Sequence, residues 1–186
     1  MIAWILLFLL VGVAIWLIAS YNKLVILKNQ TANGWKQIDV QLKRRYDLIP
    51  NLVETVKGEM KFEQDTLTKV IEARNKAIST QGVADKAVQE NALSGALRQL
   101  FALVENYPQL KANENVSQLM EELVSTENKI SFARQFYNDI ATQLNIAIET
   151  FPTNTIAGML GFKVAELFEV TDAKEKEAPK VDLNLK

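Results

Sequence analysis

The sequence predicts an all-α protein in which an N-terminal transmembrane helix leads into an antiparallel up-down helical bundle with a long, kinked first helix. Three observations predict this class. An uncharged apolar segment opens the chain, apolar residues then recur every three or four positions, and the 186 residues include only 7 glycines and 4 prolines. So few turn-forming residues argue against a many-stranded sheet, which needs frequent turns.

The opening segment has the length and composition of a membrane anchor. No charged side chain occurs from Ile2 to Asn22, and about 20 apolar residues at ~1.5 Å per residue match the ~30 Å hydrocarbon core of a bilayer. Trp4 and Tyr21 stand near the two ends, where aromatic rings settle at membrane interfaces. Trp16 lies deeper and is expected to pack against protein. Residues 1–22 are therefore predicted to form the anchor, with the lipid bilayer as its partner.

Lysines on one side of the anchor predict its orientation. Lys23, Lys28 and Lys36 follow the segment, and only the N-terminal amine precedes it. The positive-inside rule therefore predicts a single-pass protein of the cell membrane with its N-terminus outside and its bundle cytoplasmic. The alternative is an exported protein whose signal peptide is cleaved beside Ala19 and Ser20. The apolar run is longer than a ~7–15-residue signal core and lacks a preceding cation, which favours the retained anchor.

A single apolar stripe defines the first helix of the bundle. Pro50 falls inside the stripe, yet the spacing from Ile49 to Val53 is still four residues, so the helix is predicted to kink at Pro50 and continue. Burying large side chains beyond the proline, at ~1.5–3 kcal/mol each, offsets its cost of about 3 kcal/mol. Gly58 is a second weak point, and a break near residues 57–60 stays an alternative. The stripe comprises Leu24, Leu27, Thr31, Trp35, Ile38, Leu42, Tyr46, Ile49, Val53, Val56 and Met60, and it extends towards Ile78.

Turn signals separate the next two helices. Gly82 suits the end of the first stretch, and a second helix is expected over about 84–106. Pro108 ends that helix. Asn113 is a suitable N-cap for a third helix, which keeps its apolar period from Val116 to Phe151. The first and third helices are therefore the two long members of the bundle.

The end of the chain is predicted to contain a short helix and a tail. Pro152 ends the third helix, and an apolar fourth helix is expected over 155–168, packed against the bundle. The remaining residues, 169–186, are charged and nearly lack aromatic side chains, so a flexible tail is expected there. Residues 23–168 form the bundle between the anchor and this tail.

The residue types exclude several kinds of chemistry. The chain has no cysteine and no histidine, which removes disulfides, thiol nucleophiles, the commonest general base and the commonest metal ligand. A formal charge of −1 gives no general attraction to nucleic acid, so no such partner is expected. No phosphate-binding glycine loop occurs, and no cofactor is predicted. Glu54, Glu63, Glu105 and Glu127 could gather around a metal, although solvation or pairing with Lys and Arg is the simpler interpretation.

A buried polar network is predicted where cations fall on or beside the apolar stripes. The cluster Lys43–Arg45 is interpreted as a surface face with one arginine drawn into the bundle, and the alternative is a partner-binding patch. Arg134 lies on the stripe of the third helix and needs an acidic partner such as Glu54. No catalytic, cofactor-binding or metal residue is predicted. The candidate network comprises Arg44, Arg45, Asn51, Glu54, Glu127, Arg134 and Asn138.

Five segments of the sequence resemble the LemA family. They are YNKLVILKN (21–29), GWKQIDVQLKRRYDLIPNLVETVKG (34–58), EARNKA (72–77), ENYPQLKAN (105–113) and ARQFYND (133–139). The resemblance spans the chain from Met1 to about Phe168, and RRYDLIPNLVETVKG is its most specific part. It implies a membrane-anchored bundle of bacterial origin with no established catalysis. It also implies a role in membrane-associated assembly, including the shaping of internal membranes.

These patterns together predict a non-enzymatic binding or scaffolding protein at the inner face of the bacterial cytoplasmic membrane. The stripe begins directly after the anchor, so the first helix is expected to be a rigid stalk suited to side-by-side assembly. A homo-oligomer or protein partners at the membrane are therefore expected. Two alternatives stay open: an enzyme with a carboxylate-bound metal in the bundle core, and an accessory subunit of a membrane protease or envelope stress system.

Overall fold

The structure, a computed structural model, describes residues 1–58, 60 and 63–169. Within these ranges it contains helices and no strand, which confirms the predicted all-α class. The helices are numbered in their order along the chain. The helices are α1 (Ile2–Lys57), α2 (Gln64–Ser79), α3 (Val83–Val104), α4 (Pro108–Lys111), α5 (Glu114–Glu149) and α6 (Thr153–Met159).

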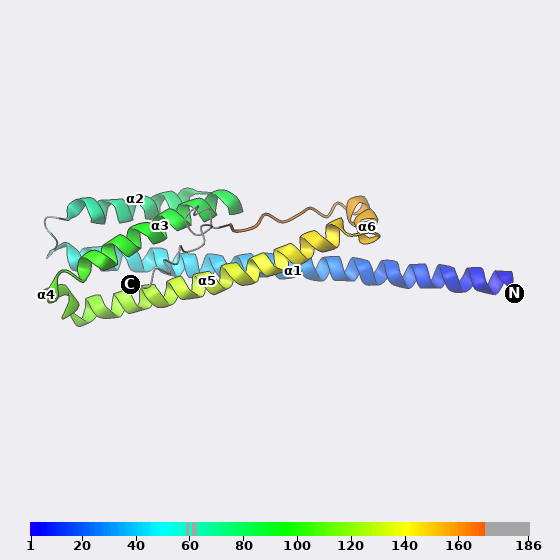
Figure 1. The fold of residues 1–186 in the computed structure, drawn as a ribbon, viewed down its shortest axis with the longest axis horizontal. Coiled ribbons are helices and arrows are strands. Elements are labelled where there is room, and N and C mark those ends of the chain that lie inside the picture. The colour runs from blue at the N-terminus through cyan, green and yellow to red at the C-terminus, as the bar shows by residue number, and fades with distance from the viewer. Residues whose placement is uncertain (59, 61–62, 170–186) are drawn as a thin grey trace, which may run out of the picture.

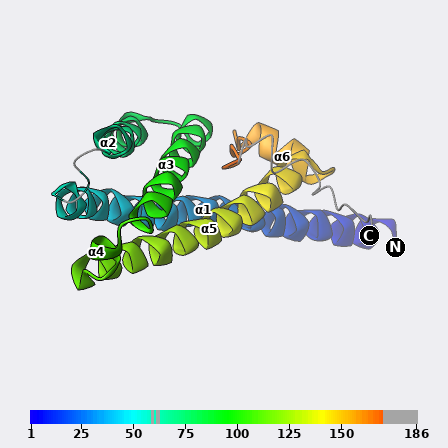
Figure 2. The ribbon, with the colours of Figure 1, turned by 60° about the vertical axis from the view of Figure 1, so that its left-hand side comes forward.

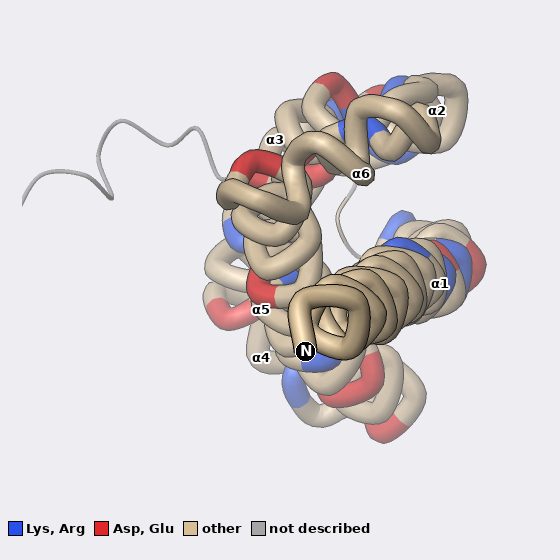
Figure 3. The backbone as a smooth tube through the Cα atoms, turned by 90° about the vertical axis from the view of Figure 1, so that its right-hand side faces the viewer, with Lys and Arg blue, Asp and Glu red and all other residues tan. Residues whose placement is uncertain are grey.

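Two long helices form the frame of the molecule. α1 has 56 residues and runs along its whole length, and α5 lies antiparallel against the bundle half of α1 (Figure 1). α2 and α3 form an antiparallel hairpin that covers one side of the α1–α5 pair, as the two ribbon views show (Figures 1 and 2). Among the described residues, no helix covers the opposite side of that pair. The N-terminal turns of α1 extend beyond the bundle and carry no charged residue (Figure 3).

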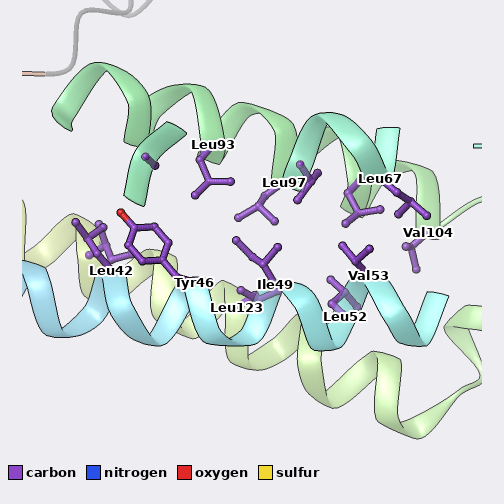
Figure 4. Close-up of a cluster of buried hydrophobic side chains, with 14 of the residues drawn as sticks. Leu42, Tyr46, Ile49, Leu52, Val53, Leu67, Leu93, Leu97, Val104 and Leu123 are labelled. Atoms are coloured by element: carbon purple, nitrogen blue, oxygen red, sulfur yellow. The ribbon is translucent and has the colours of Figure 1, made fainter. Parts of the chain in front are cut away.

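The predicted apolar stripe of α1 is the centre of the core. Its residues from Leu24 to Met60 are buried, apart from Trp35, which is half-buried. They meet leucines and valines of α2, α3 and α5 (Figure 4). Because each large aliphatic side chain contributes ~1.5–3 kcal/mol on burial, this stripe is the main reason that the helix is stable over such a length.

Helix boundaries follow the local turn signals closely. α1 passes Pro50 without interruption and ends at Lys57, so the break near residues 57–60 is the alternative that the structure adopts. Gly82, with a φ of 87°, precedes α3. The Asn113 side chain accepts hydrogen bonds from the backbone N–H groups of Asn115 and Val116, and so caps α5 as predicted.

The C-terminal part of the bundle differs from the prediction. The expected helix over 155–168 is wrong beyond Met159, where α6 ends. Gly161 adopts a φ of 70°, which favours glycine, and the following residues run extended back along α5 until Phe168 enters the core. Helical geometry would carry Phe168 away from that position. The predicted tail lies outside the described residues, apart from Glu169.

Candidate functional site

Arg74 explains how α1 passes through its proline. Pro50 has no N–H group, so the carbonyl oxygen of Tyr46, four residues earlier, loses its normal helical donor. Arg74 of α2 donates Nε–H to that oxygen at 2.8 Å. The missing backbone hydrogen bond is thus replaced by one from a neighbouring helix. Apolar packing and the Arg74 hydrogen bond together keep α1 helical through Pro50.

A buried ionic network joins three helices just before that proline. Arg45 of α1 is fully buried and donates to Glu90 of α3 and Glu127 of α5. It also donates to the Ser94 hydroxyl at 2.9 Å, and that hydroxyl donates to Glu127 at 2.8 Å. The Tyr46 hydroxyl donates to the second oxygen of Glu90. One guanidinium therefore ties α1, α3 and α5 together inside an apolar core.

Burial controls the protonation of the groups around this network. It raises the pKa of Tyr46 to about 12, although the neighbouring Arg45 charge acts in the opposite direction. Burial also lowers the pKa of Arg134 to about 10, and the positive charge of Arg45 adds to this effect while Glu127 opposes it. In both cases the neutral form is favoured because a charged form loses its hydration. At neutral pH the Tyr46 hydroxyl therefore stays protonated and Arg134 stays charged.

Arg134 lies beside the network and is covered by the C-terminal segment. Its Nη1 donates to Asn91 at 3.2 Å, and its guanidinium carbon lies 4.4 Å from the centroid of the Phe168 ring. An aromatic face stabilises a cation at this distance without a carboxylate. The predicted pairing of Arg134 with Glu54 is therefore wrong: Glu54 is exposed and lies 3.7 Å from Lys57 on its own helix.

Two asparagines of α5 hold the extended segment through its backbone. Asn138 donates to the carbonyl oxygen of Phe168 at 3.0 Å and accepts from its N–H at 2.8 Å. Asn145 makes the same pair of bonds with Ala165, at 2.9 and 2.7 Å. The distance between the two asparagines matches the distance between their two partners. Seven residues of the α5 helix and three residues of the extended segment both span about 10 Å. Asn138 thus serves this segment and not the Arg45 network, which corrects its predicted placement.

Two other members of the predicted network lie on the surface. Arg44 is exposed and pairs with Glu122 at 3.4 Å, also exposed. Asn51 is exposed. Its backbone carbonyl accepts a hydrogen bond from the Thr55 hydroxyl, and its side chain makes no hydrogen bond to the described residues. The predicted placement of Arg44 and Asn51 in the buried network is wrong for the same reason. They fall on the outward side of α1, where water competes for their polar groups. Of the predicted network, Arg45 and Glu127 are brought together.

The sequence analysis did not predict four residues that take part in these contacts: Glu90, Ser94, Arg74 and Asn145. Glu90 carried a usable signal, because it falls on the stripe that includes Ala87 and Leu93 and is buried with them. A carboxylate on an apolar stripe demands a cation, and this would have pointed to Arg45. The other three residues depend on the packing of separate helices, for which the sequence holds no local sign.

The predicted anchor residues all lie on the N-terminal half of α1. Trp4, Tyr21, Lys23 and Lys28 are exposed. The Tyr21 and Phe162 rings make an edge contact at 6.4 Å, and Lys28 lies over the Phe162 ring at 5.8 Å. Trp16, which was expected to pack against protein, is 37% exposed, the lowest value among the large apolar side chains from Ile2 to Ile18. By length and composition α1 can cross a bilayer, and its apolar window is not buried by the rest of the chain.

An open groove runs between α1 and α5, and all of the residues that line it belong to these two helices. Its volume is about 730 Å³, and two exposed phenylalanines, Phe132 and Phe136, line it together with Val40. Lys36 and Lys129 also line it. Phe132 is 72% exposed. Such a cluster of large apolar side chains on a water-facing surface is typical of a protein contact surface.

These features define a class: an all-α, membrane-associated protein in which one apolar helix continues into a bundle closed by a buried ionic network. The LemA family model matches residues 34–183, and the chain belongs to the LemA family.

Relatives with curated names agree with this assignment. The chain is 29% identical to Protein LemA of Metamycoplasma hominis over 167 residues, which is 88% of this chain and 73% of that protein. It is 27% identical to Magnetosome protein MamQ 2 of Paramagnetospirillum magneticum over 179 residues, 82% of this chain and 66% of the relative. Magnetosome protein MamQ of Magnetospirillum gryphiswaldense is 24% identical over 178 residues, 82% of this chain and 65% of the relative. The chain therefore spans about two thirds of the MamQ proteins.

Proposed function

We propose that this protein is a single-pass, membrane-anchored, non-enzymatic scaffold at the inner face of the bacterial cytoplasmic membrane. The observation that carries the proposal is the continuity of α1. Its exposed apolar turns and its buried stripe belong to one helix, and the buried stripe begins at Leu24. A membrane segment joined to a bundle without a linker transmits the orientation of the anchor to the whole domain.

The distribution of charge supports the proposed orientation. Lys23, Lys28 and Lys36 follow the apolar segment of α1, and no charged side chain lies within it. Cations beside a membrane helix favour the cytoplasmic side. The bundle is accordingly assigned to the cytoplasm and the N-terminus to the outside.

The buried carboxylates favour a structural role over metal chemistry. The buried Glu90 and the half-buried Glu127 both accept from the Arg45 guanidinium. A cation already neutralises this pair, so the acidic residues do not form an open ligand set. Glu54 is exposed elsewhere on the surface, beside Lys57. Rigidity of the bundle is the property that the network best explains.

We further infer that copies of the protein assemble side by side through the α1–α5 groove. Phe132, Phe136 and Val40 offer an exposed apolar surface there, and no residue of α2 or α3 lines the groove. Burying three such side chains against a second copy would contribute roughly 1.5–3 kcal/mol each. The groove lies along the long axis of the molecule, which suits lateral contact between upright, anchored copies.

Cysteine crosslinking in intact bacteria tests this function. The chain has no native cysteine, so Phe132→Cys can be compared directly with Lys69→Cys on the exposed face of α2. The proposal predicts that the full chain stays with the membrane after an alkaline wash and that an oxidant produces disulfide-linked dimers only at position 132. Release by the wash would contradict the anchor. Equal crosslinking at both positions, or none at position 132, would contradict assembly through the groove.

A further inference from the structure

A second uncharged segment lies near the C-terminal end of α5. From Thr150 to Phe162 no side chain is charged, and Glu149 and Lys163 flank this run. The segment contains α6 and the turns on either side of it. A surface helix of a water-soluble bundle normally presents charged residues to the solvent. The water-facing side of α6 lacks them.

This segment lies against the membrane helix and not only against the bundle. Ile156, Met159 and Leu160 form one wall of an apolar hollow, and Leu17, Ile18 and Tyr21 of α1 form the other. Figure 1 shows α6 beside α1 at the end of the bundle that faces the N-terminus. Leu17 and Ile18 belong to the apolar turns assigned to the bilayer. A neighbour that touches them is therefore at the depth of the lipid.

Large apolar side chains point outward from the same segment. Met159 is 83% exposed, Phe151 is 80% exposed and Leu160 is 54% exposed. Exposure of such side chains to water costs ~1.5–3 kcal/mol each relative to burial. On the inner side, Ala157 packs with Leu24 and Leu27 in a small core of its own. The segment is thus amphipathic in the sense needed at a membrane: one side binds the bundle, and the other side is apolar and uncovered.

Lysines follow the apolar turns of α1 and come directly after the uncharged segment in the sequence. Lys23, Lys28 and Lys163 are exposed, and Lys28 lies over the ring of Phe162. Basic side chains beside an apolar surface bind the anionic headgroups of a leaflet, at about 1 kcal/mol per residue close to the surface. The order along α1 is therefore apolar turns first, then aromatic residues, then lysines, as at a lipid interface.

We propose that residues 150–162 are inserted into the leaflet from which α1 emerges, between its headgroups and its acyl chains. The occupant of the uncovered surface is lipid, because this surface is continuous with the lipid-facing turns of α1. The inference rests on the proposed membrane anchoring. α1 and α6 then contact the membrane at two points, and these fix the rotation of α1 about its own axis. The bundle, with its groove between α1 and α5, is held at one angle to the membrane.

Depth-dependent fluorescence quenching tests this placement. Single cysteines at Met159, Leu10 and Phe132 of the full chain are labelled with an environment-sensitive dye. The protein is then reconstituted into vesicles of equal parts phosphatidylcholine and phosphatidylglycerol. Nitroxide lipids report contact with the leaflet, and aqueous iodide reports contact with water. An interfacial residue buried by ~5–10 Å predicts at least about threefold stronger nitroxide quenching at 159 than at 132. It also predicts correspondingly weaker iodide quenching at 159.

The three positions separate the possible failures. Lipid quenching at 10 and 159, with 132 open to iodide, supports the insertion. Lipid quenching at 10 alone, with 159 as open to iodide as 132, overturns the insertion and leaves the anchor in place. Iodide quenching at all three positions overturns both. A label at Phe151 repeats the measurement on the other side of α6, and it must agree with position 159. Helical circular dichroism of each labelled protein checks that the bundle is folded.

Discussion

At the scale of single residues, the Arg74 contact is what lets a proline occupy a helix that must stay unbroken. The contact joins Nε–H of Arg74 to the carbonyl oxygen of Tyr46 that Pro50 leaves without a helical donor. A hydrogen bond from a charged donor, such as this one to a partly buried carbonyl, contributes about 1.5–3 kcal/mol. Arg74 therefore compensates for Pro50, and the effects of substituting these two residues on stability are expected to be coupled.

A double-mutant cycle measures that coupling. Arg74→Ala should lower the free energy of unfolding by about 1–3 kcal/mol, because the Tyr46 carbonyl then lacks a partner. In a Pro50→Ala background, the backbone N–H of residue 50 bonds that carbonyl, and the same Arg74→Ala change should cost clearly less. Urea unfolding of the four proteins gives the values. Equal costs in the two backgrounds would show that Arg74 does not compensate for the proline.

Arg44 and Arg45 offer a matched pair for testing the buried network. Arg45→Met should cost about 3–5 kcal/mol, because it leaves Glu90 buried without a counter-charge. Arg44→Met should cost no more than about 1 kcal/mol, because its partner Glu122 is exposed. Adding Glu90→Leu to Arg45→Met should recover part of the loss, and denaturant unfolding of each variant checks the order. Equal costs for Arg44→Met and Arg45→Met would contradict the network.

The phenol of Tyr46 provides a pH test. Burial raises its pKa to about 12, above the ordinary value of 10.0. Between these two pH values the folded chain keeps a proton that the unfolded chain has lost. Tyr46 therefore contributes stability below pH 10 that disappears as the pH rises towards 12. The phenolate absorbance of the protein minus that of Tyr46→Phe should show one group titrating near pH 12 while the helices persist; titration near pH 10 would contradict its burial.

At the scale of elements, the asparagines of α5 determine where the last described segment lies. Asn138 and Asn145 bind the backbone of Phe168 and Ala165 in the manner of a neighbouring strand. The Tyr137 hydroxyl adds a bond to the carbonyl oxygen of Glu166 at 2.7 Å. Because these hydrogen bonds are made to backbone atoms of the segment, they fix its register along α5. This register brings Phe168 over Arg134.

Removing one asparagine should release the segment without unfolding the bundle. Asn145→Ala deletes both bonds to Ala165, and each is worth about 0.5–1.5 kcal/mol. The amide of Ala165 should then exchange with solvent at least about fivefold faster, which hydrogen exchange by NMR measures. Asn51→Ala is the control, since its side chain is exposed and should leave this amide unchanged. Unchanged exchange in Asn145→Ala would show that packing of Phe168 alone holds the segment.

Signals within a few residues predicted most of the elements. Apolar periodicity, Gly82, Asn113 and the unbroken phase across Pro50 located the main helices, because helix formation depends on near neighbours. The failure after Met159 has a different cause. Residues 162–168 follow the surface of α5 through backbone bonds to asparagines, and no pattern within that short segment specifies such a partner. The Arg45–Glu90 pair is a different case, because Glu90 lies on the apolar stripe of α3 and that position indicates a buried cation as its partner.

At the scale of the whole molecule, the structure combines a long continuous helix with an open groove beside it. α1 carries both the exposed apolar turns and the central stripe of the core. The groove between α1 and α5 lies along this axis. Anchored copies would meet with their grooves at the same height above the membrane, which raises their effective concentration on a surface.

Charging the groove should abolish self-association without unfolding the monomer. Phe132→Asp places a carboxylate on the most exposed aromatic residue of the groove, which is 72% exposed, so the free energy of unfolding should change by less than about 0.5 kcal/mol. Light scattering of the detergent-solubilised full chain should show oligomers for the parent protein and monomers for the variant. Lys69→Asp on α2 is the control and should stay oligomeric. Parent protein that is monomeric at every concentration would contradict assembly.

The continuity of α1 across the membrane surface is the central claim, and one distance tests it most directly. Spin labels on cysteines at Ala19 and Lys43, both exposed on α1, are separated by 24 residues. An unbroken helix places them about 36 Å apart at ~1.5 Å per residue. Pulsed electron resonance of the full chain in lipid vesicles should give one narrow distribution at this distance. A broad distribution, or one centred at a clearly shorter distance, would show a hinge between anchor and bundle and contradict the account.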